Sequence, residues 1–294
     1  MRKILIKSMF FALCLFFVSD SFVMADAPWK WKMILQHVKE RDYILHPTAL
    51  YADKEKARYY VVDSGRNRLV SFDLKGKFLS SFTANNQLQI PFDLVRDESV
   101  LWITEKGKNT VTRIDLEAKK VVPNTITSQG KKVFPHRLEM LNDTLYVLDK
   151  SSGSIFSINK NMQDMQKYSC HTCKAGFFDF KLSGNKIWAL EQQERAVYVF
   201  SLEGELEERI QLADSQLEFP VSLAIDAAST IYILDRHQAN INVFDSRGQY
   251  KYSFLELGQA RGQLYYPIEI QFDPWGNLSV VEEGNGRVQI FGRK

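Results

Sequence analysis

The sequence is poor in the residues that mark many functional classes. Its 294 residues include three cysteines and five histidines, and the formal net charge is only +3. A charge this close to neutral gives no whole-molecule argument for nucleic-acid or membrane-surface binding. No nucleophile–base pair, phosphate-binding glycine loop or complete set of metal ligands stands in a recognisable spacing. The sequence therefore predicts no catalytic residue, no cofactor and no nucleic-acid partner.

Long apolar segments are absent after the first two dozen residues. Near the start, three basic residues precede a mostly apolar run at 8–18, and Val23 and Ala25 supply small residues at positions −3 and −1 of a cleavage site. This layout is typical of a secretory signal peptide. The apolar run is short for a membrane anchor, although an uncleaved anchor is the alternative. We expect residues 1–25 to be removed, leaving no stable membrane span and a mature protein that is periplasmic or secreted.

Removal of that segment leaves two cysteines, Cys170 and Cys173. An oxidising compartment favours a disulfide between them. Covalent haem attachment would need a histidine where Lys174 stands, and a redox-active pair is usually found in a βαβ context. A zinc site would need a second half elsewhere in the chain. We therefore expect a small disulfide in a loop between two structural repeats.

What the chain does contain is a repeat of about 44 residues. Six apolar runs each end in an acid, with spacings of 42, 44, 42, 44 and 47 residues: Asp63, Glu105, Asp149, Glu191, Asp235 and Glu282. A large apolar residue follows each acid by nine positions: Phe72, Ile114, Ile158, Phe200, Phe244 and Phe291. A proline precedes five of the acids by 14 to 16 positions: Pro47, Pro91, Pro135, Pro220 and Pro267. The fourth repeat has Ala175 and Gly176 instead.

Each repeat predicts four short antiparallel strands, with glycines such as Gly76, Gly204 and Gly248 turning the chain into the fourth. Six such sheets form an all-β, six-bladed β-propeller. We expect one domain at 26–294, with blades at about 46–85, 90–128, 134–170, 175–214, 219–258 and 266–294. The sixth repeat has no fourth strand of its own. We expect a segment at about 29–38 to complete that blade and close the ring, which removes an open sheet edge.

Parts of the chain resemble a known repeat. The segments 258–267 and 276–291 are similar to an NHL repeat, 62–72 is close to one, and 234–244 is a fair match. The resemblance to the NHL-repeat family implies a six-bladed β-propeller, but it says little about function because this scaffold hosts many activities.

The same family includes peptidyl-amidating lyases, in which histidines directly after the blade prolines hold a channel zinc ion. In this chain the position reads Thr48, Phe92, His136, Phe177, Val221 and Ile268. One histidine is too few for a catalytic zinc site, which needs three protein ligands. A site built from His46, His136 and His237 remains the alternative, and with it a channel-metal-dependent lyase or lactonase-type hydrolase.

The six repeated acids have a structural interpretation. An acid at the end of a strand accepts hydrogen bonds from the backbone N–H groups of a turn. Arg68 and Arg287 each stand five positions after their blade's acid and are expected to pair with it.

The loops of one face are rich in basic residues, and this is the basis of the functional prediction. The candidate ligand-binding residues are Arg66, Lys106, His136, Arg137, Lys150, Arg236 and His237. Together they predict a binding or scaffold module for an anionic protein, peptide or glycan ligand, recognised through charge-assisted hydrogen bonds. The alternative is a loop rim that is charged for solubility alone.

Overall fold

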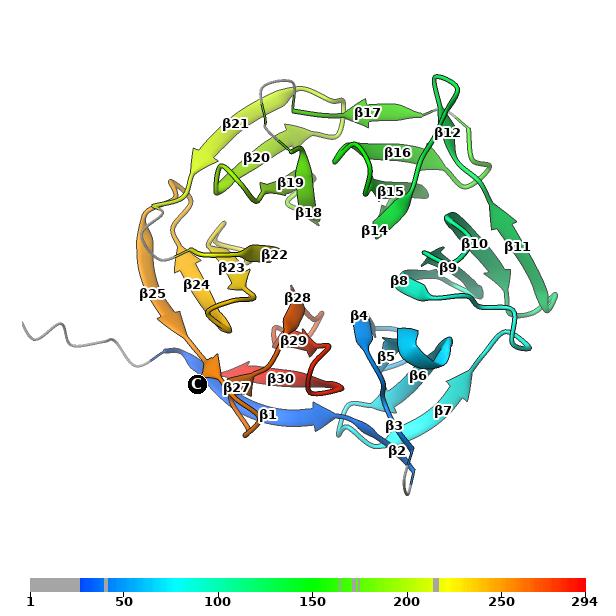
Figure 1. Cartoon of the computed structure of the whole chain (residues 1–294), viewed down its shortest axis with the longest axis horizontal. Helices are drawn as coiled ribbons and strands as arrows, with labels where there is room; N and C mark the ends of the chain where they lie inside the picture. Colours follow the sequence, from blue (N-terminus) through cyan, green and yellow to red (C-terminus); the bar gives the residue numbers. More distant parts are fainter. Residues whose placement is uncertain (1–26, 40–41, 164, 171–172, 174, 214–216) are drawn as a thin grey trace, which may run out of the picture.

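The computed structural model describes residues 27–294 apart from 40–41, 164, 171–172, 174 and 214–216. The predicted signal peptide at 1–25 lies outside the described residues. Six four-stranded antiparallel sheets are arranged radially around a central axis, and one edge strand of each sheet lies next to that axis (Figure 1). The predicted all-β, six-bladed β-propeller is confirmed.

Blades 1 to 3 follow in chain order. Blade 1 consists of β4 (Pro47–Asp53), β5 (Arg58–Asp63), β6 (Arg68–Asp73) and β7 (Phe78–Phe82). Blade 2 consists of β8 (Pro91–Asp97), β9 (Val100–Glu105), β10 (Thr110–Asp115) and β11 (Lys120–Asn124). Blade 3 consists of β14 (Pro135–Leu141), β15 (Thr144–Asp149), β16 (Ile155–Asn159) and β17 (Gln166–Tyr168).

Blades 4 to 6 complete the ring. Blade 4 consists of β18 (Phe177–Ser183), β19 (Lys186–Glu191), β20 (Ala196–Ser201) and β21 (Leu206–Gln211). Blade 5 consists of β22 (Pro220–Ile225), β23 (Ile231–Asp235), β24 (Asn240–Phe244) and β25 (Tyr250–Phe254). Blade 6 consists of β28 (Pro267–Phe272), β29 (Leu278–Glu282), β30 (Arg287–Arg293) and β1 (Trp29–Leu35).

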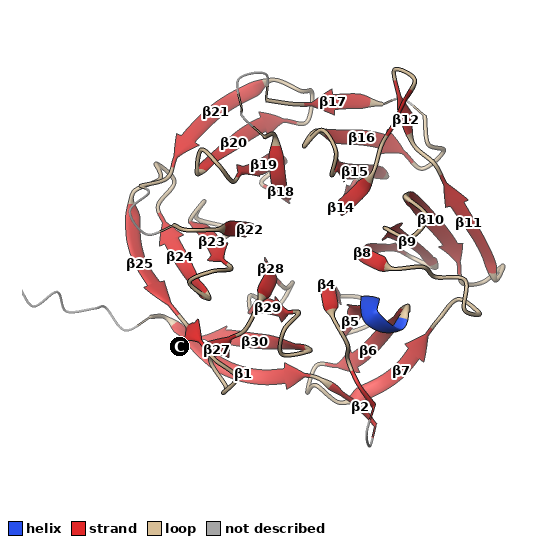
Figure 2. Ribbon diagram, in the orientation of Figure 1, coloured by secondary structure: helices blue, strands red, loops and turns tan. Residues whose placement is uncertain are grey.

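The remaining elements are short. Three small ribbons pair β2 (His37–Lys39) with β3 (Asp42–Tyr43), β12 (Thr127–Ser128) with β13 (Lys131–Lys132), and β26 (Glu256–Leu257) with β27 (Gln263–Leu264). The one helical element among the described residues is a single 3-10 turn, η1 (Ser64–Arg66), drawn in blue in Figure 2. No helix in the described part of the chain is long and apolar enough to cross a membrane.

The N-terminal strand closes the ring. β1 pairs antiparallel with β30, from Trp29 opposite Arg293 to Leu35 opposite Val288, and so supplies the outer strand that blade 6 lacks. Trp29 also packs into the apolar layer between blades 5 and 6, where its ring lies 5.8 Å from that of Phe272. Side chains from neighbouring blades interdigitate in such layers, as β-branched and aromatic residues do between packed sheets.

The repeated acids organise the loops of each blade. Asp63, Glu105 and Glu282 accept a backbone N–H from the loop that leads into the blade, and Glu191 accepts one from the turn that follows it. Asp149 and Asp235 accept from both. The expected arginine pairs are present: Arg68 Nε lies 2.7 Å from Asp63, and Arg287 Nε lies 2.7 Å from Glu282. Because all six acids are buried, these bonds hold the loops in fixed positions.

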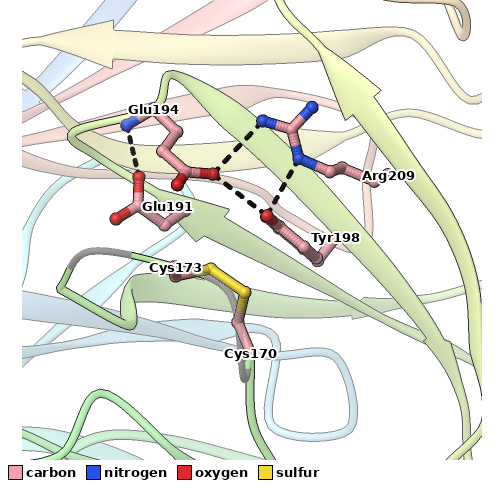
Figure 3. Close-up of a disulfide and its surroundings, with 6 residues drawn as sticks. All are labelled: Cys170, Cys173, Glu191, Glu194, Tyr198 and Arg209. Atoms are coloured by element: carbon pink, nitrogen blue, oxygen red, sulfur yellow. Dashed lines mark hydrogen bonds and ion pairs between the residues drawn. A yellow bond between two sulfur atoms is a disulfide. The ribbon is translucent and has the colours of Figure 1, made fainter.

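The two remaining cysteines lie between blades 3 and 4. Cys170 and Cys173 are joined by a disulfide with a Cα–Cα distance of 5.4 Å, and both pack against the apolar layer between those blades (Figure 3). Nearby, Tyr198 donates a hydrogen bond to Glu194 and accepts one from Arg209. The disulfide lies beside the sheet of blade 4.

Candidate functional site

The innermost strands all carry a β-bulge at their start. In blade 2, Pro91 pairs with Glu105 and Asp93 with Thr104, so Phe92 has no partner on β9. The register shifts at the corresponding place in each of the other blades. A bulge turns local side chains away from the regular alternation of a strand. It therefore places two consecutive side chains of each blade near the axis.

The pairing corrects the sequence alignment of blade 4. Phe177 pairs with Glu191 as Pro135 pairs with Asp149, so Phe177 stands at the position of the missing proline. The residue that follows this position is Phe178, and the sequence-based choice of Phe177 was wrong by one residue. Without a proline as a marker, the start of the strand could be found only from its pairing.

The second residue after each strand start forms a layer within the channel. In blade order these residues are Ala49, Asp93, Arg137, Asp179, Ser222 and Glu269. Arg137 is only 3% exposed, and its guanidinium lies 3.9 Å from Asp93, 3.7 Å from Asp179 and 3.4 Å from Glu269. We call this set of four side chains the arginine layer.

The arginine layer satisfies nearly all of its own polar groups. Arg137 donates hydrogen bonds to the carbonyl oxygens of Thr48 and Ile268, at 3.0 and 2.9 Å. Burial acts to lower the pKa of Arg137, but the charges of Glu269, Asp179 and Asp93 outweigh it and raise that pKa. Burial, together with the charge of Glu269, raises the pKa of Asp93 to about 8.

A second polar group lies beneath this layer, two residues further along the strands. Lys181 Nζ lies 3.2 Å from Glu139 and 3.1 Å from Glu269, beside a cavity of about 200 Å³. Burial acts to lower the pKa of Lys181, but Glu269 and Glu139 raise it overall. The channel is therefore crossed by two cations, Arg137 and Lys181, and each has carboxylate partners within the fold.

The mouth of the channel is different. Here the ring is formed by the residue after each repeated acid: Ser64, Lys106, Lys150, Gln192, Arg236 and Glu283. Arg236 lies 2.9 Å from Glu283 and is neutralised by it. Lys106 and Lys150 make no ion pair with a carboxylate among the described residues. Lys106 Nζ lies 3.2 Å from the centre of the Phe92 ring, and Lys150 Nζ lies 4.4 Å from that of Phe178.

His136 lies between these two rings. Its ring centre is 4.3 Å from that of Phe92 and 6.4 Å from that of Phe178. The residue is 6% exposed, and its Nδ1 atom is buried without a hydrogen-bond partner among the described residues. A buried polar atom without a partner is costly and calls for an explanation such as a missing ligand or water. We call Lys106, Lys150, His136, Phe92 and Phe178 the mouth cluster.

The electrostatics of the mouth cluster follow from its crowding. The ammonium end of Lys106 lies over an aromatic ring, although the residue as a whole is exposed. This burial, with the charges of Arg137 and Lys150, lowers the pKa of Lys106 to about 8. Burial and the charge of Arg137 also lower the pKa of Lys150. For His136, burial followed by Arg137, Lys106 and Lys150 lowers the pKa well below its usual value. An anion here would relieve the repulsion among the cations.

The structure brings together only some of the basic residues that were predicted to form the binding face. Lys106, His136 and Lys150 lie together, but Arg137 lies below them in the channel rather than on a loop. Arg66 lies 3.5 Å from Asp42, and Arg236 is paired as described. His237 stacks on Phe219 with a centroid distance of 4.5 Å. Paired or stacked residues of this kind offer less charge to a ligand than the sequence indicates.

The sequence did not point to the two phenylalanine rings of the mouth cluster, to the channel acids Asp179 and Glu139, or to Lys181. Among the sequence-based candidates, Phe92 appears only as a position that lacks a histidine, and Phe178 and Asp179 do not appear. The available signal was positional, since these residues stand one and two positions after the start of an innermost strand.

The geometry does not fit the metal site considered from the sequence. His46 lies beside Glu283 at 3.9 Å, while His136 and His237 contact different phenylalanine rings. No group of three or more His, Cys, Asp or Glu side chains suited to a metal ion occurs within the described residues. At the axis, the carboxylates that would attract a cation surround the guanidinium of Arg137 instead. No step through a metal is derived for this chain.

Comparison with known proteins supports the fold. No protein-family model and no curated protein sequence matches the chain. Among solved structures, a streptogramin B lyase aligns with a TM-score of 0.66 at 12% identity over 92% of this chain and 100% of that one. A virginiamycin B lyase from Staphylococcus aureus aligns with a TM-score of 0.62 at 14% identity over 84% of this chain and 80% of that one. A gluconolactonase from Xanthomonas campestris aligns with a TM-score of 0.63 at 14% identity, over 86% and 89%. At such identities the likeness shows the propeller fold.

Proposed function

We propose that this protein is a propeller-type binding module that takes an anionic group of its ligand at the mouth cluster. The observation that carries the proposal is the pair of lysines, Lys106 and Lys150, which lie over aromatic rings without a carboxylate partner among the described residues. Lysines that serve only solubility extend into water, where their hydration is complete. Both residues are exposed as a whole, but their ammonium ends lie over aromatic rings, and burial there lowers the pKa of each.

The chemistry of the mouth cluster favours a carboxylate, sulfate or phosphate. Lys106 and Lys150 supply charge-assisted hydrogen bonds to such a group. The rings of Phe92 and Phe178 exclude water and so strengthen these contacts. We also propose that the protein acts outside the cytosol, where a disulfide such as Cys170–Cys173 persists.

The test compares two double variants of equal net charge. K106Q/K150Q removes the mouth lysines, and K75Q/K251Q removes two exposed lysines of blades 1 and 5. The probes are fluorescent oligogalacturonate and fluorescent polyglutamate, titrated at low salt. We expect the mouth variant to bind either probe about tenfold more weakly or worse, and the control to bind within about twofold of the wild type. Equal loss in both variants would show attraction by net charge alone and would contradict the proposal.

A second candidate is an enzyme of the lyase or lactonase type. It is favoured by the names of the similar solved structures and by Lys106, whose amine with a pKa of about 8 is suited to accept a proton near neutral pH. The check is a pH-stat assay with glucono-lactone and an assay for cleavage of a streptogramin B. Turnover by the wild type that is lost in K106M would favour this candidate over simple binding.

A further inference from the structure

The mouth cluster is bordered by apolar side chains that the fold leaves exposed. Leu45, Ile90, Phe134 and Tyr266 are 45%, 50%, 38% and 49% exposed. Each lies one or two residues before the innermost strand of its blade, and the blades are four consecutive ones: 6, 1, 2 and 3. We call these four residues the apolar arc. Exposed apolar residues that gather in this way mark interaction surfaces more often than single ones do.

The arc is attached directly to the loops of the mouth. The carbonyl oxygen of Ile90 accepts the N–H of Lys106, and that of Phe134 accepts the N–H of Lys150, both at 2.9 Å. Tyr266 accepts the N–H of Glu283 in the same manner. The exposed apolar residues Ile90 and Phe134 and the lysines Lys106 and Lys150 therefore belong to loops that are joined by backbone hydrogen bonds.

Two members of the arc are held in an unfavourable backbone conformation. Ile90 and Tyr266 have φ angles of 49° and 46°, and each precedes a proline. A positive φ is a genuine outlier for a β-branched residue, and the position before proline normally favours extended backbone. Ile90 is fixed there because its N–H donates to Asn67 at 2.6 Å. His46 and Gly176 stand at the same position of blades 1 and 4 and have φ angles of 52° and 77°, so this conformation belongs to the repeat and fixes where the arc residues lie.

We propose that the mouth face binds a protein or peptide segment in which an acidic side chain enters the mouth cluster and apolar neighbours pack on the apolar arc. The proposal rests on the proposed function, whose anionic group it identifies as the carboxylate of a polypeptide. Charge complementarity selects the acid, since Lys106 and Lys150 have no carboxylate partner within the described residues. The aliphatic Leu45 and Ile90 match apolar side chains better than they match the hydroxyl groups of a sugar.

The test uses fluorescence anisotropy with two matched peptides and one glycan. The first peptide carries a glutamate flanked by leucine and phenylalanine, the second has glutamine in place of the glutamate, and the glycan is oligogalacturonate. We expect the wild type to bind the glutamate peptide at least about tenfold more tightly than either of the other probes. Ile90→Asn should weaken binding of that peptide about tenfold, because one exposed apolar contact is lost.

The melting temperature of Ile90→Asn shows whether this variant folds. Asparagine tolerates a positive φ, so Ile90→Asn should melt at the same temperature as the wild type or higher. Leu79→Ser removes an exposed apolar residue from an outer strand and should leave binding unchanged. Should Ile90→Asn fail to fold, Phe134→Ser, which lies outside the set of positive-φ residues, gives the same measurement.

The outcomes separate the two proposals. Normal peptide binding by Ile90→Asn or Phe134→Ser would overturn the role of the apolar arc. Binding of oligogalacturonate in preference to both peptides would overturn the polypeptide partner and leave the proposed function standing. Failure of the wild type to bind any of the three probes at low salt would count against both.

Discussion

His136 and Arg137 are neighbours in one β-bulge, yet they belong to layers of opposite character. Arg137 meets three carboxylates and two backbone carbonyl oxygens at the axis, so its charge is matched within the fold. His136 lies one step nearer the solvent, with two unpaired lysines around it and a buried nitrogen that has no partner among the described residues. The repeat builds both layers from the same backbone geometry.

This difference distinguishes charged residues that stabilise the ring from charged residues that are available to a ligand. A buried charge that the fold itself neutralises needs no ligand, and its removal leaves its partners uncompensated. A cation that is desolvated but unpaired raises the free energy of the free protein and is relieved when an anion binds. On this criterion the arginine layer holds the blades together, and the mouth cluster is the site at which we propose that a ligand binds.

Replacing Arg137 should have the largest effect. Arg137→Met would leave Asp93, Asp179 and Glu269 without their cation and should lower the free energy of unfolding by about 3–5 kcal/mol. Arg137→Lys retains the charge and should lose less. Lys106→Met, by contrast, should leave stability unchanged or raise it slightly. Urea unfolding followed by tryptophan fluorescence measures all three, and equal effects of Arg137→Met and Lys106→Met would remove the distinction between the layers.

The pH dependence of binding tests the mouth cluster separately. Lys106 carries its charge below a pKa of about 8 and loses it above, while a carboxylate ligand stays ionised. Affinity for oligogalacturonate or the glutamate peptide should therefore fall about tenfold between pH 7 and pH 9. Lys106→Arg keeps its charge over this range and should show a flatter profile. A decline as steep in Lys106→Arg as in the wild type would assign the titration to another group.

The smallest effect is expected for Arg66. Its ion pair with Asp42 is exposed, with 42% of the arginine side chain accessible, and Arg68 also binds that carboxylate. Arg66→Ala should change the free energy of unfolding by no more than about 0.5 kcal/mol and should leave ligand affinity nearly unchanged. A clear loss of affinity in this variant would extend the binding site from the mouth cluster to the rim of blade 1.

The fold could be predicted from the sequence because its determinants are local and repeated. The acid that ends β5 or β23 also ends the second strand of every other blade, and each acid bonds to loops that the repeat places at similar distances. The glycines at 76, 204 and 248 have φ angles of 79°, 102° and 79°, as turns into the fourth strand require. Blade 4, which lacks the proline, still has the acid Glu191 and the turn glycine Gly204.

The site could not be predicted to the same degree because it depends on partners far apart in the sequence. Arg236 was selected as a free cation, but Glu283 of the next blade neutralises it. Arg137 was assigned to a loop, since nothing local shows that acids from three other blades surround it. Lys106 and Lys150 differ from Arg66 and Arg236 in having no carboxylate partner among the described residues, and no local pattern shows this.

The pairing of β1 with β30 has a consequence for the synthesis of the chain. β1 leaves the ribosome long before its sheet neighbour β30 has been made, so it lacks this partner during synthesis of the intervening blades. The ring closes only after β30 has been made, which makes closure a late and non-local step. A polypeptide that is interrupted before β30 keeps an open sheet edge, and such an edge distinguishes an unfinished copy from a finished one for proteases and chaperones.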